Sequence, residues 1–161
     1  MNLSVPYVSP PFGLEAGWID YNGHLNVAYY HVVFDQALDD VLISLGLGPG
    51  YASLRKLSTF TVETHTCYLA EVPSEAKVQV ITQLLAADRK RLHFFHEMRS
   101  FTGGTLHATC EQLSLHVDLV RRRACEFPAD IQNKVDEMKL AHRRLPVPER
   151  AGRNIALKRP D

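Results

Sequence analysis

The chain has 161 residues and a mass of 18.2 kDa, enough for one domain with a buried core and too little for two. Its 18 Lys and Arg residues balance 18 Asp and Glu residues, so it lacks the positive surplus of proteins that bind nucleic acid or anionic membranes. Hydrophobic residues make up 45%, which is ordinary for a folded, soluble protein.

We expect a cytoplasmic protein without a membrane span, because the start is not signal-like and no apolar run approaches the ~18 residues that a span requires. The three cysteines form no CxxC pair and are expected to be reduced. His93 and His96 would face opposite sides of a strand, and His24 and His31 lack partner ligands, so no metal site is expected. The sequence also lacks a phosphate loop and a dinucleotide fingerprint, and we expect no cofactor.

The first third of the chain predicts one long helix. After a Pro-rich, irregular opening, a short strand over 12–19 leads into the segment 20–26, which reads Asp-Tyr-Asn-Gly-His-Leu-Asn. The pair Asn22-Gly23 alone would suggest a hairpin turn, but a helical period follows it. Apolar residues recur at steps of three and four: Tyr30, Val33, Phe34, Ala37, Leu38, Val41 and Leu45. This pattern predicts a helix over 27–45, capped by Asn26 and ended by Gly46.

The rest of the chain alternates with a period of two, which indicates strands. From Phe60 the pattern predicts one face with Val62, Thr64, Thr66 and Tyr68 and the other with Thr61, Glu63, His65 and Cys67. A helical turn is expected over 51–56, further strands over 77–86, 91–101, 106–119 and 122–127, and a hairpin turn at 102–104. A second helix is expected over 129–142, ahead of a basic tail over 143–161.

This order of elements predicts an α+β fold in which a curved antiparallel sheet wraps around the long helix. Residues 1–142 would form the domain, and the tail would be either a solvated end or an arm that bridges subunits. Such a wrap leaves a strand edge and the outer face of the sheet open, so we expect a homodimer or a dimer of dimers.

Four segments carry a resemblance to a known family. The segment 20–26, followed by Tyr29 and Tyr30, resembles the D-x-x-G-H-[VLM]-N signature of hotdog-fold acyl-CoA thioesterases of the 4-hydroxybenzoyl-CoA thioesterase family. The segments 61–65 (TVETH), 90–96 (KRLHFFH) and 111–118 (EQLSLHVD) are similar to a subgroup with betainyl-CoA thioesterases and the thioesterase domains fused to carnitine dehydrogenases. The resemblance covers 13–127 and implies a site at a dimer interface that draws on both chains.

The resemblance implies that Asp20 is the catalytic carboxylate, acting as nucleophile or as general base on water. The first N–H groups of a helix lack intrahelical partners, so donors between Gly23 and Val27 could polarise a thioester carbonyl. The resemblance implies that the Val27 N–H is this donor. Asp20 could instead only bind the turn backbone, and Gly23 would supply a positive φ. His24 and Asn26 are interpreted first as capping and turn-fixing residues, with a positioning role in the site as the alternative.

The acyl group and coenzyme A would have separate contacts. Glu63 and His65 either project together into a cleft or form a solvated face; Glu63 could then oppose the charge of a betainyl group. Candidate aromatic walls for that cation are Trp18, Tyr29, Tyr30 and Tyr68. The turn with Arg89, Lys90 and Arg91 either is simply solvated or, as the resemblance implies, binds the phosphates of coenzyme A.

The sequence thus favours a thioesterase acting on a short, betainyl-type acyl-CoA. A non-catalytic acyl-CoA binding or sensing protein is the alternative, and the carboxylate at Asp20 argues against it because a sensor does not need one. A hotdog dehydratase would require a histidine with an acidic partner at another place in the fold.

Overall fold

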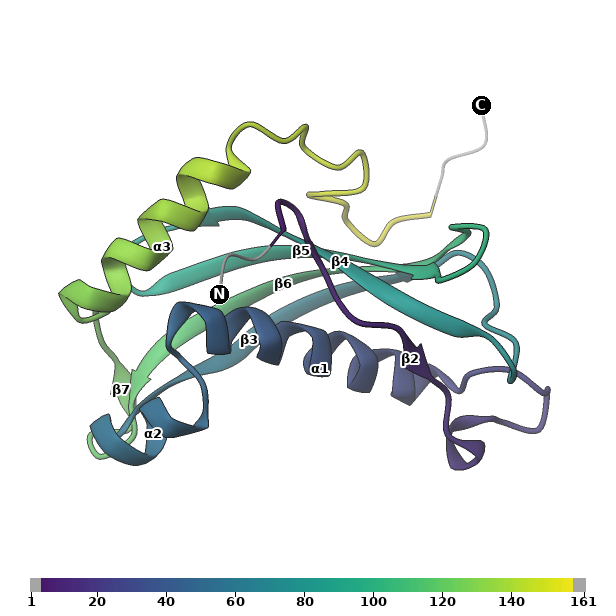
Figure 1. Ribbon diagram of the computed structural model, residues 1–161, viewed down its shortest axis with the longest axis horizontal. Helices are drawn as coiled ribbons and strands as arrows, with labels where there is room; N and C mark the ends of the chain where they lie inside the picture. Colours follow the sequence, from purple (N-terminus) through teal and green to yellow (C-terminus); the bar gives the residue numbers. More distant parts are fainter. Residues whose placement is uncertain (1–3, 158–161) are drawn as a thin grey trace.

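In the computed structural model, which describes residues 4–157, one antiparallel sheet curves around a long helix (Figure 1). The long strands β3 (Leu57–Tyr68), β4 (Lys77–Ala87), β5 (Arg91–Ser100) and β6 (Leu106–Asp118) lie in the order β4-β5-β6-β3. The short strands β1 (Tyr7–Val8) and β2 (Phe12–Gly13) pair with β4, and β7 (Arg123–Ala124) pairs with β6. The helices are α1 (Val27–Leu45), α2 (Pro49–Arg55), α3 (Ala129–His142) and the short 3-10 helix η1 (Ala16–Trp18). The predicted α+β class is confirmed.

Helix α1 has the predicted boundaries. The Asn26 side chain accepts a hydrogen bond from the Ala28 N–H at 3.0 Å, which satisfies one of the unpaired donors of the first turn. Gly46 ends the helix at φ 84°, a left-handed conformation that glycine adopts without steric cost. All seven members of the predicted apolar stripe are buried.

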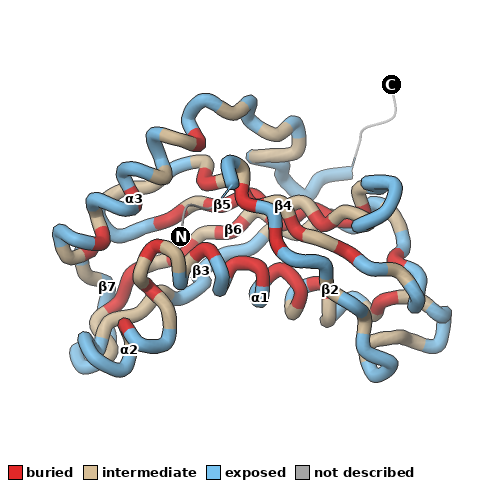
Figure 2. The backbone as a smooth tube through the Cα atoms, viewed as in Figure 1, coloured by how far each residue is buried: buried red, intermediate tan, exposed pale blue. Residues whose placement is uncertain are grey.

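The core lies between α1 and the concave face of the sheet, where the buried positions gather (Figure 2). The first half of α1 packs through Val33 and Phe34 against Val78 and Met98 of the sheet. The second half packs against the sheet and α3 in a second cluster, which contains Leu38, Val41, Leu45, Leu84, Phe94, Ile131 and Val135. No helix within residues 4–157 has both the length and the apolar character needed to cross a membrane.

Helix α3 and the segment after it cover parts of the sheet that β1 leaves open. The Leu84 N–H of β4 donates to His142 Nδ1 at 2.9 Å, so α3 provides an acceptor for an edge donor of β4 beyond β1.

Residues 143–157 fold back over the outer face of the sheet (Figure 1), where the Gly152 N–H donates to Glu111 Oε2 at 2.6 Å. Phe95, in register with Glu111 on that face, is only 2% exposed. The described part of the tail thus touches the sheet at Pro146 and Gly152, while its own residues stay exposed or half-buried, with Ile155 92% and Leu157 97% exposed.

Three expectations for the shorter elements are wrong. The Pro-rich opening is not irregular throughout, because β1 pairs with β4 and the Tyr7 hydroxyl donates to Asp40 at 2.7 Å. The strand expected over 12–19 ends at Gly13, because a hydrogen bond from the Trp18 N–H to the Glu15 carbonyl closes a 3-10 turn. The strand expected over 122–127 is reduced to the two residues of β7.

A β-bulge in β3 changes the predicted faces of this strand. Thr61 pairs with Ser114, but the next paired residue, Glu63, is opposite Leu113, so Val62 is an extra residue. Gln112, which belongs to the buried face of β6, donates to Thr61 Oγ1 at 2.8 Å, whereas Glu63 lies on the outer face. The expectation that Thr61 shares a face with Glu63 and His65 is therefore wrong, and Phe60 is likewise separated from Thr64, Thr66 and Tyr68.

His96 is a fully buried histidine in the middle of this core. Its Nδ1 lies 2.9 Å from Thr82 Oγ1, and its ring centroid is 5.9 Å from that of Phe34 and 6.0 Å from that of Phe94. Burial lowers the pKa of His96 to about 3, because the apolar surroundings disfavour the charged ring. In the unfolded chain a histidine titrates near pH 6.5.

We expect the free energy of unfolding to fall as the pH is lowered from about 6.5 toward 3, because only the unfolded chain takes up the proton of His96. This residue contributes up to ~1.4 kcal/mol per pH unit in that range. Urea unfolding of wild type and His96→Gln at about pH 7.5 and about pH 5 measures the slope, with the exposed His31→Gln as control. An equal slope in wild type and His96→Gln would contradict the assignment.

Candidate active site

A tight turn brings Asp20 to the N-terminus of α1. The Gly23 N–H donates to the Asp20 carbonyl at 3.0 Å, and the Asp20 N–H donates to the His24 carbonyl at the same distance. Gly23 has φ 85°, which is the positive value predicted for it. An antiparallel bridge between Ile19 and Leu25 closes the turn. The hairpin turn that Asn22-Gly23 suggested is therefore present, and the helix begins directly after it.

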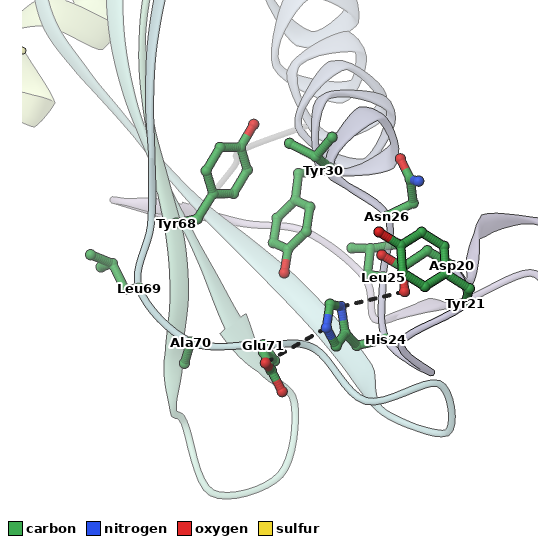
Figure 3. Close-up of a pocket in the computed structure, with 11 residues that line it drawn as sticks. Asp20, Tyr21, His24, Leu25, Asn26, Tyr30, Tyr68, Leu69, Ala70 and Glu71 are labelled. Carbon is green, nitrogen blue, oxygen red and sulfur yellow. Dashed lines mark ion pairs between the residues drawn. The ribbon is translucent and has the colours of Figure 1, made fainter.

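The Asp20 carboxylate is mostly buried and has few partners. Oδ1 accepts the Asn22 N–H at 2.8 Å, so Asp20 does fix the turn, while Oδ2 lies 3.4 Å from Asn22 Nδ2. His24 stands between two carboxylates: its Nδ1 is 3.9 Å from Asp20 Oδ1, and its Nε2 is 3.6 Å from Glu71 Oε1 (Figure 3). His24 Nδ1 is buried and has no hydrogen-bond partner among the described residues.

The start of α1 leaves one backbone donor free beside this carboxylate. Asn26 takes the Ala28 N–H on its side chain and the Tyr29 N–H on its carbonyl, both at 3.0 Å. Among the hydrogen bonds within residues 4–157, none uses the Val27 N–H. Because Val27 is the first residue of α1, this donor lies at the positive end of the helix dipole, where it could bind a carbonyl oxygen or an oxyanion.

Asp20 and Val27 line the same cavity, which has a volume of about 540 Å³. Its walls come from the turn, from the start of α1 and from the end of β3 with the loop that follows: Asp20, Tyr21, His24, Leu25, Asn26, Val27, Tyr30, Tyr68, Leu69, Ala70 and Glu71 (Figure 3). Tyr30 and Tyr68 meet with ring centroids 5.0 Å apart and planes at 82°. Burial raises the pKa of both phenols, so they stay neutral at ordinary pH.

The structure places several predicted site residues outside this cavity. Tyr29 stacks on Trp18 at 5.4 Å between centroids, and neither of them lines it. Glu63 and His65 do project together, as one interpretation had it, but into a separate cavity of about 340 Å³ on the outer face of the sheet. That cavity also contains His93, whose Nε2 lies 2.7 Å from Glu111 Oε1.

The basic turn lies at the opposite end of the sheet from Asp20. Arg89 and Lys90 connect β4 to β5, whereas the Asp20 turn bridges to Pro73, just ahead of the other end of β4. Arg89 pairs with Glu126 at 2.7 Å, and Arg91 Nε donates to Asp88 at 2.7 Å. Within one chain, therefore, the structure does not bring these cations to the cavity.

Glu71 is the charged wall residue that the sequence did not predict, and Tyr21, Leu25, Leu69 and Ala70 are uncharged ones. Glu71 lies in the loop after β3, which the sequence analysis did not consider for the site. Loop positions show no periodicity from which a face could be predicted, and its contact with His24 depends on the bridge between His24 and Pro73. Its carboxyl group, in a loop whose neighbouring residues Leu69, Ala70 and Val72 are apolar, was the available signal.

Comparison with known proteins assigns the chain to a family. The profile of the thioesterase-like superfamily matches residues 14–135, so the chain belongs to this superfamily, and it is a thioester hydrolase with the hotdog fold. It is 43% identical over 140 residues to the betainyl-CoA thioesterase of Pseudomonas aeruginosa, covering 87% of this chain and 88% of that one. It is also 34% identical over 146 residues to the L-carnitine dehydrogenase/betainyl-CoA thioesterase of Rhizobium meliloti, covering 91% of this chain and 29% of that longer protein.

Solved structures agree with this assignment. A hypothetical protein from Staphylococcus aureus, solved in complex with CoA, superposes with a TM-score of 0.88 at 25% identity, covering 98% of this chain and all of that one. A Pseudomonas putida protein solved as a candidate thioesterase superposes with a TM-score of 0.78 at 33% identity, covering 99% of each chain.

Proposed function

We propose that the chain hydrolyses betainyl-CoA to betaine and free coenzyme A, with Asp20 as the catalytic carboxylate. The observation that carries this proposal is the juxtaposition of the Asp20 carboxylate and the unused Val27 N–H in one cavity. The substrate is suggested by the relatives from Pseudomonas aeruginosa and Rhizobium meliloti.

In this mechanism the thioester carbonyl oxygen accepts a hydrogen bond from the Val27 N–H. That bond strengthens as negative charge develops on the oxygen, and the positive end of α1 stabilises the same charge. Asp20, whose Oδ1 is held by the Asn22 N–H at 2.8 Å, then acts at the carbonyl carbon, with His24 Nδ1 beside it at 3.9 Å. Tyr30 and Tyr68 border the space for the acyl group.

Two routes are open to Asp20. As a nucleophile, it forms a mixed anhydride, the C–S bond breaks, and the thiolate leaves with a proton before water hydrolyses the anhydride. As a general base, it takes a proton from water while the water oxygen attacks the carbon; the C–S bond of the tetrahedral intermediate then breaks, and the thiolate leaves and takes up that proton. A single turnover in ¹⁸O-water distinguishes the general-base route from an anhydride that water opens at the Asp20 carbonyl carbon, because only the latter delivers an unlabelled oxygen of Asp20 to the first product acid and leaves ¹⁸O in the Asp20 carboxylate.

We expect Asp20→Asn to lower kcat for betainyl-CoA by ~10²-fold or more, because the amide is neither a base nor a nucleophile of comparable strength. Thiol release from a panel of betainyl-, short neutral, aromatic and long-chain acyl-CoAs measures this loss. Asp136→Asn, on the exposed side of α3, is the matched control and should keep wild-type rates. Esters that bind to wild type without turnover would instead favour the acyl-CoA binding or sensing protein.

The proposal extends to coenzyme A and to a second copy of the chain. Strand β3 forms an edge of the sheet, and its apolar side chains Phe60, Val62 and Tyr68 are exposed. Antiparallel pairing of two β3 edges about a two-fold axis would place the Arg89–Arg91 turn of the partner at the Asp20 end of this chain. Each site would then take Asp20 from one chain and its phosphate contacts from the other.

Removing the cations of the turn should weaken the contact with the phosphates of coenzyme A. We expect the Arg89→Ala/Lys90→Ala variant to raise KM for acyl-CoA by about tenfold and to leave kcat nearly unchanged, since these groups contact a part remote from the bond cleaved. KM for the acyl-pantetheine, which lacks the nucleotide, should not change. Arg143→Ala/Arg144→Ala, at two exposed positions after α3, removes the same charge as a control.

Shared sites also predict complementation. When Asp20→Asn chains and Arg89→Ala/Lys90→Ala chains are unfolded together and refolded, half of the sites in each mixed dimer contain both intact groups. Activity at low acyl-CoA concentration should therefore exceed the mean of the two pure variants. A mixture that equals this mean, or a protein that sediments as a monomer, would refute the shared site.

A further inference from the structure

The Asp20 cavity has an unusual balance of charge for a site that binds an acyl group. Asp20 and Glu71 contribute two carboxylates, and among the residues that the structure describes no lysine or arginine lines the cavity. The one basic group, His24, lies between these carboxylates and within reach of both. A cavity with this lining attracts a cation and repels an acyl group that ends in a carboxylate.

The aromatic residues of the cavity add a second preference for a cation. Tyr30, from α1, and Tyr68, from the end of β3, stand nearly perpendicular with centroids 5.0 Å apart, so they form two walls of a corner. Tyr30 is held rigidly, at 5% exposure, whereas Tyr68 is 46% exposed and borders the open side. Ring faces attract quaternary ammonium groups, and a methylated ammonium loses little hydration when it enters such a corner.

We propose that Tyr30, Tyr68 and Glu71 form the binding site for a quaternary ammonium group at the end of the acyl chain. The two rings contact its methyl groups, and the Glu71 carboxylate opposes its charge. This inference rests on the proposed function and adds the residues that bind the cationic end of the acyl group. The sequence suggested Glu63 as the counter-ion, and the inference assigns that role to Glu71. Glu63 lies on the outer face of the sheet, in the other cavity.

The arrangement also suits the geometry of a short acyl group. Val27 and Tyr30 lie three residues apart on α1 and therefore project from one side of it. A carbonyl bound at the Val27 N–H thus has Tyr30 within about one helical turn, and the methyl groups of a betainyl ammonium, whose nitrogen is two bonds from the carbonyl carbon, extend toward that ring. A long fatty chain would instead need an apolar tunnel, whereas this cavity is lined by the Asp20 and Glu71 carboxylates.

The test compares two non-hydrolysable thioethers of the same shape, S-(2-trimethylammonioethyl)-CoA and S-(3,3-dimethylbutyl)-CoA, which differ by one nitrogen for carbon. We expect wild type to bind the cationic thioether about tenfold more tightly in calorimetric titrations.

Glu71→Gln should weaken binding of the cationic ligand only, by about threefold, because the Glu71 side chain is exposed and its charge is screened. Tyr68→Leu keeps an apolar wall and should weaken the cationic ligand by roughly three- to tenfold. Glu63→Gln is the matched control and should leave both affinities unchanged.

Equal affinity of wild type for the two thioethers would overturn the inference, and so would an effect of Glu63→Gln in place of Glu71→Gln. Equal weakening of both ligands by Glu71→Gln would overturn the role of Glu71 as counter-ion, because its effect would then not depend on the charge of the ligand. These outcomes are measured as binding, so they are independent of turnover. A failure of the proposed hydrolysis would appear instead as absent thiol release from every acyl-CoA of the panel.

Discussion

The burial of one face of α1 in the concave side of the sheet is the constraint on which the other features depend. Covering that face requires the sheet to curve, and the curvature holds the end of β3 and its following loop beside the first turn of the helix. Tyr30 belongs to both the core and the site, since it packs in the core and also lines the cavity. The site is therefore rigid where it adjoins the core and open where Tyr68 and Glu71 border it.

The features that could be predicted from the sequence are encoded by neighbouring residues. The apolar stripe of α1, the cap at Asn26 and the ends at Val27 and Leu45 depend on interactions within a few residues, and the structure agrees with each of them. The turn with Gly23 is equally local. The part of the candidate site from Asp20 to Tyr30, which supplies most of the cavity lining, was accessible for this reason.

The other half depends on contacts between distant segments. The bulge at Val62 moves Thr61 to the opposite face from Glu63, and a period of two contains no sign of the inserted residue. Glu71 reaches His24 only because its loop bridges to the Asp20 turn. Tyr7, in a segment whose prolines suggested irregular chain, pairs with β4 for the same kind of reason. A single sequence does not encode such pairings locally.

The segment that crosses the outer face has a consequence for how copies of the chain could stack. Two sheets that pack face to face lie about 10 Å apart, with their side chains interdigitated. The backbone around Gly152, hydrogen-bonded to Glu111 above the buried Phe95, occupies that layer. Any stacking over the middle of the sheet must therefore meet this segment first, so the residues around Gly152 determine which higher-order assemblies are geometrically accessible.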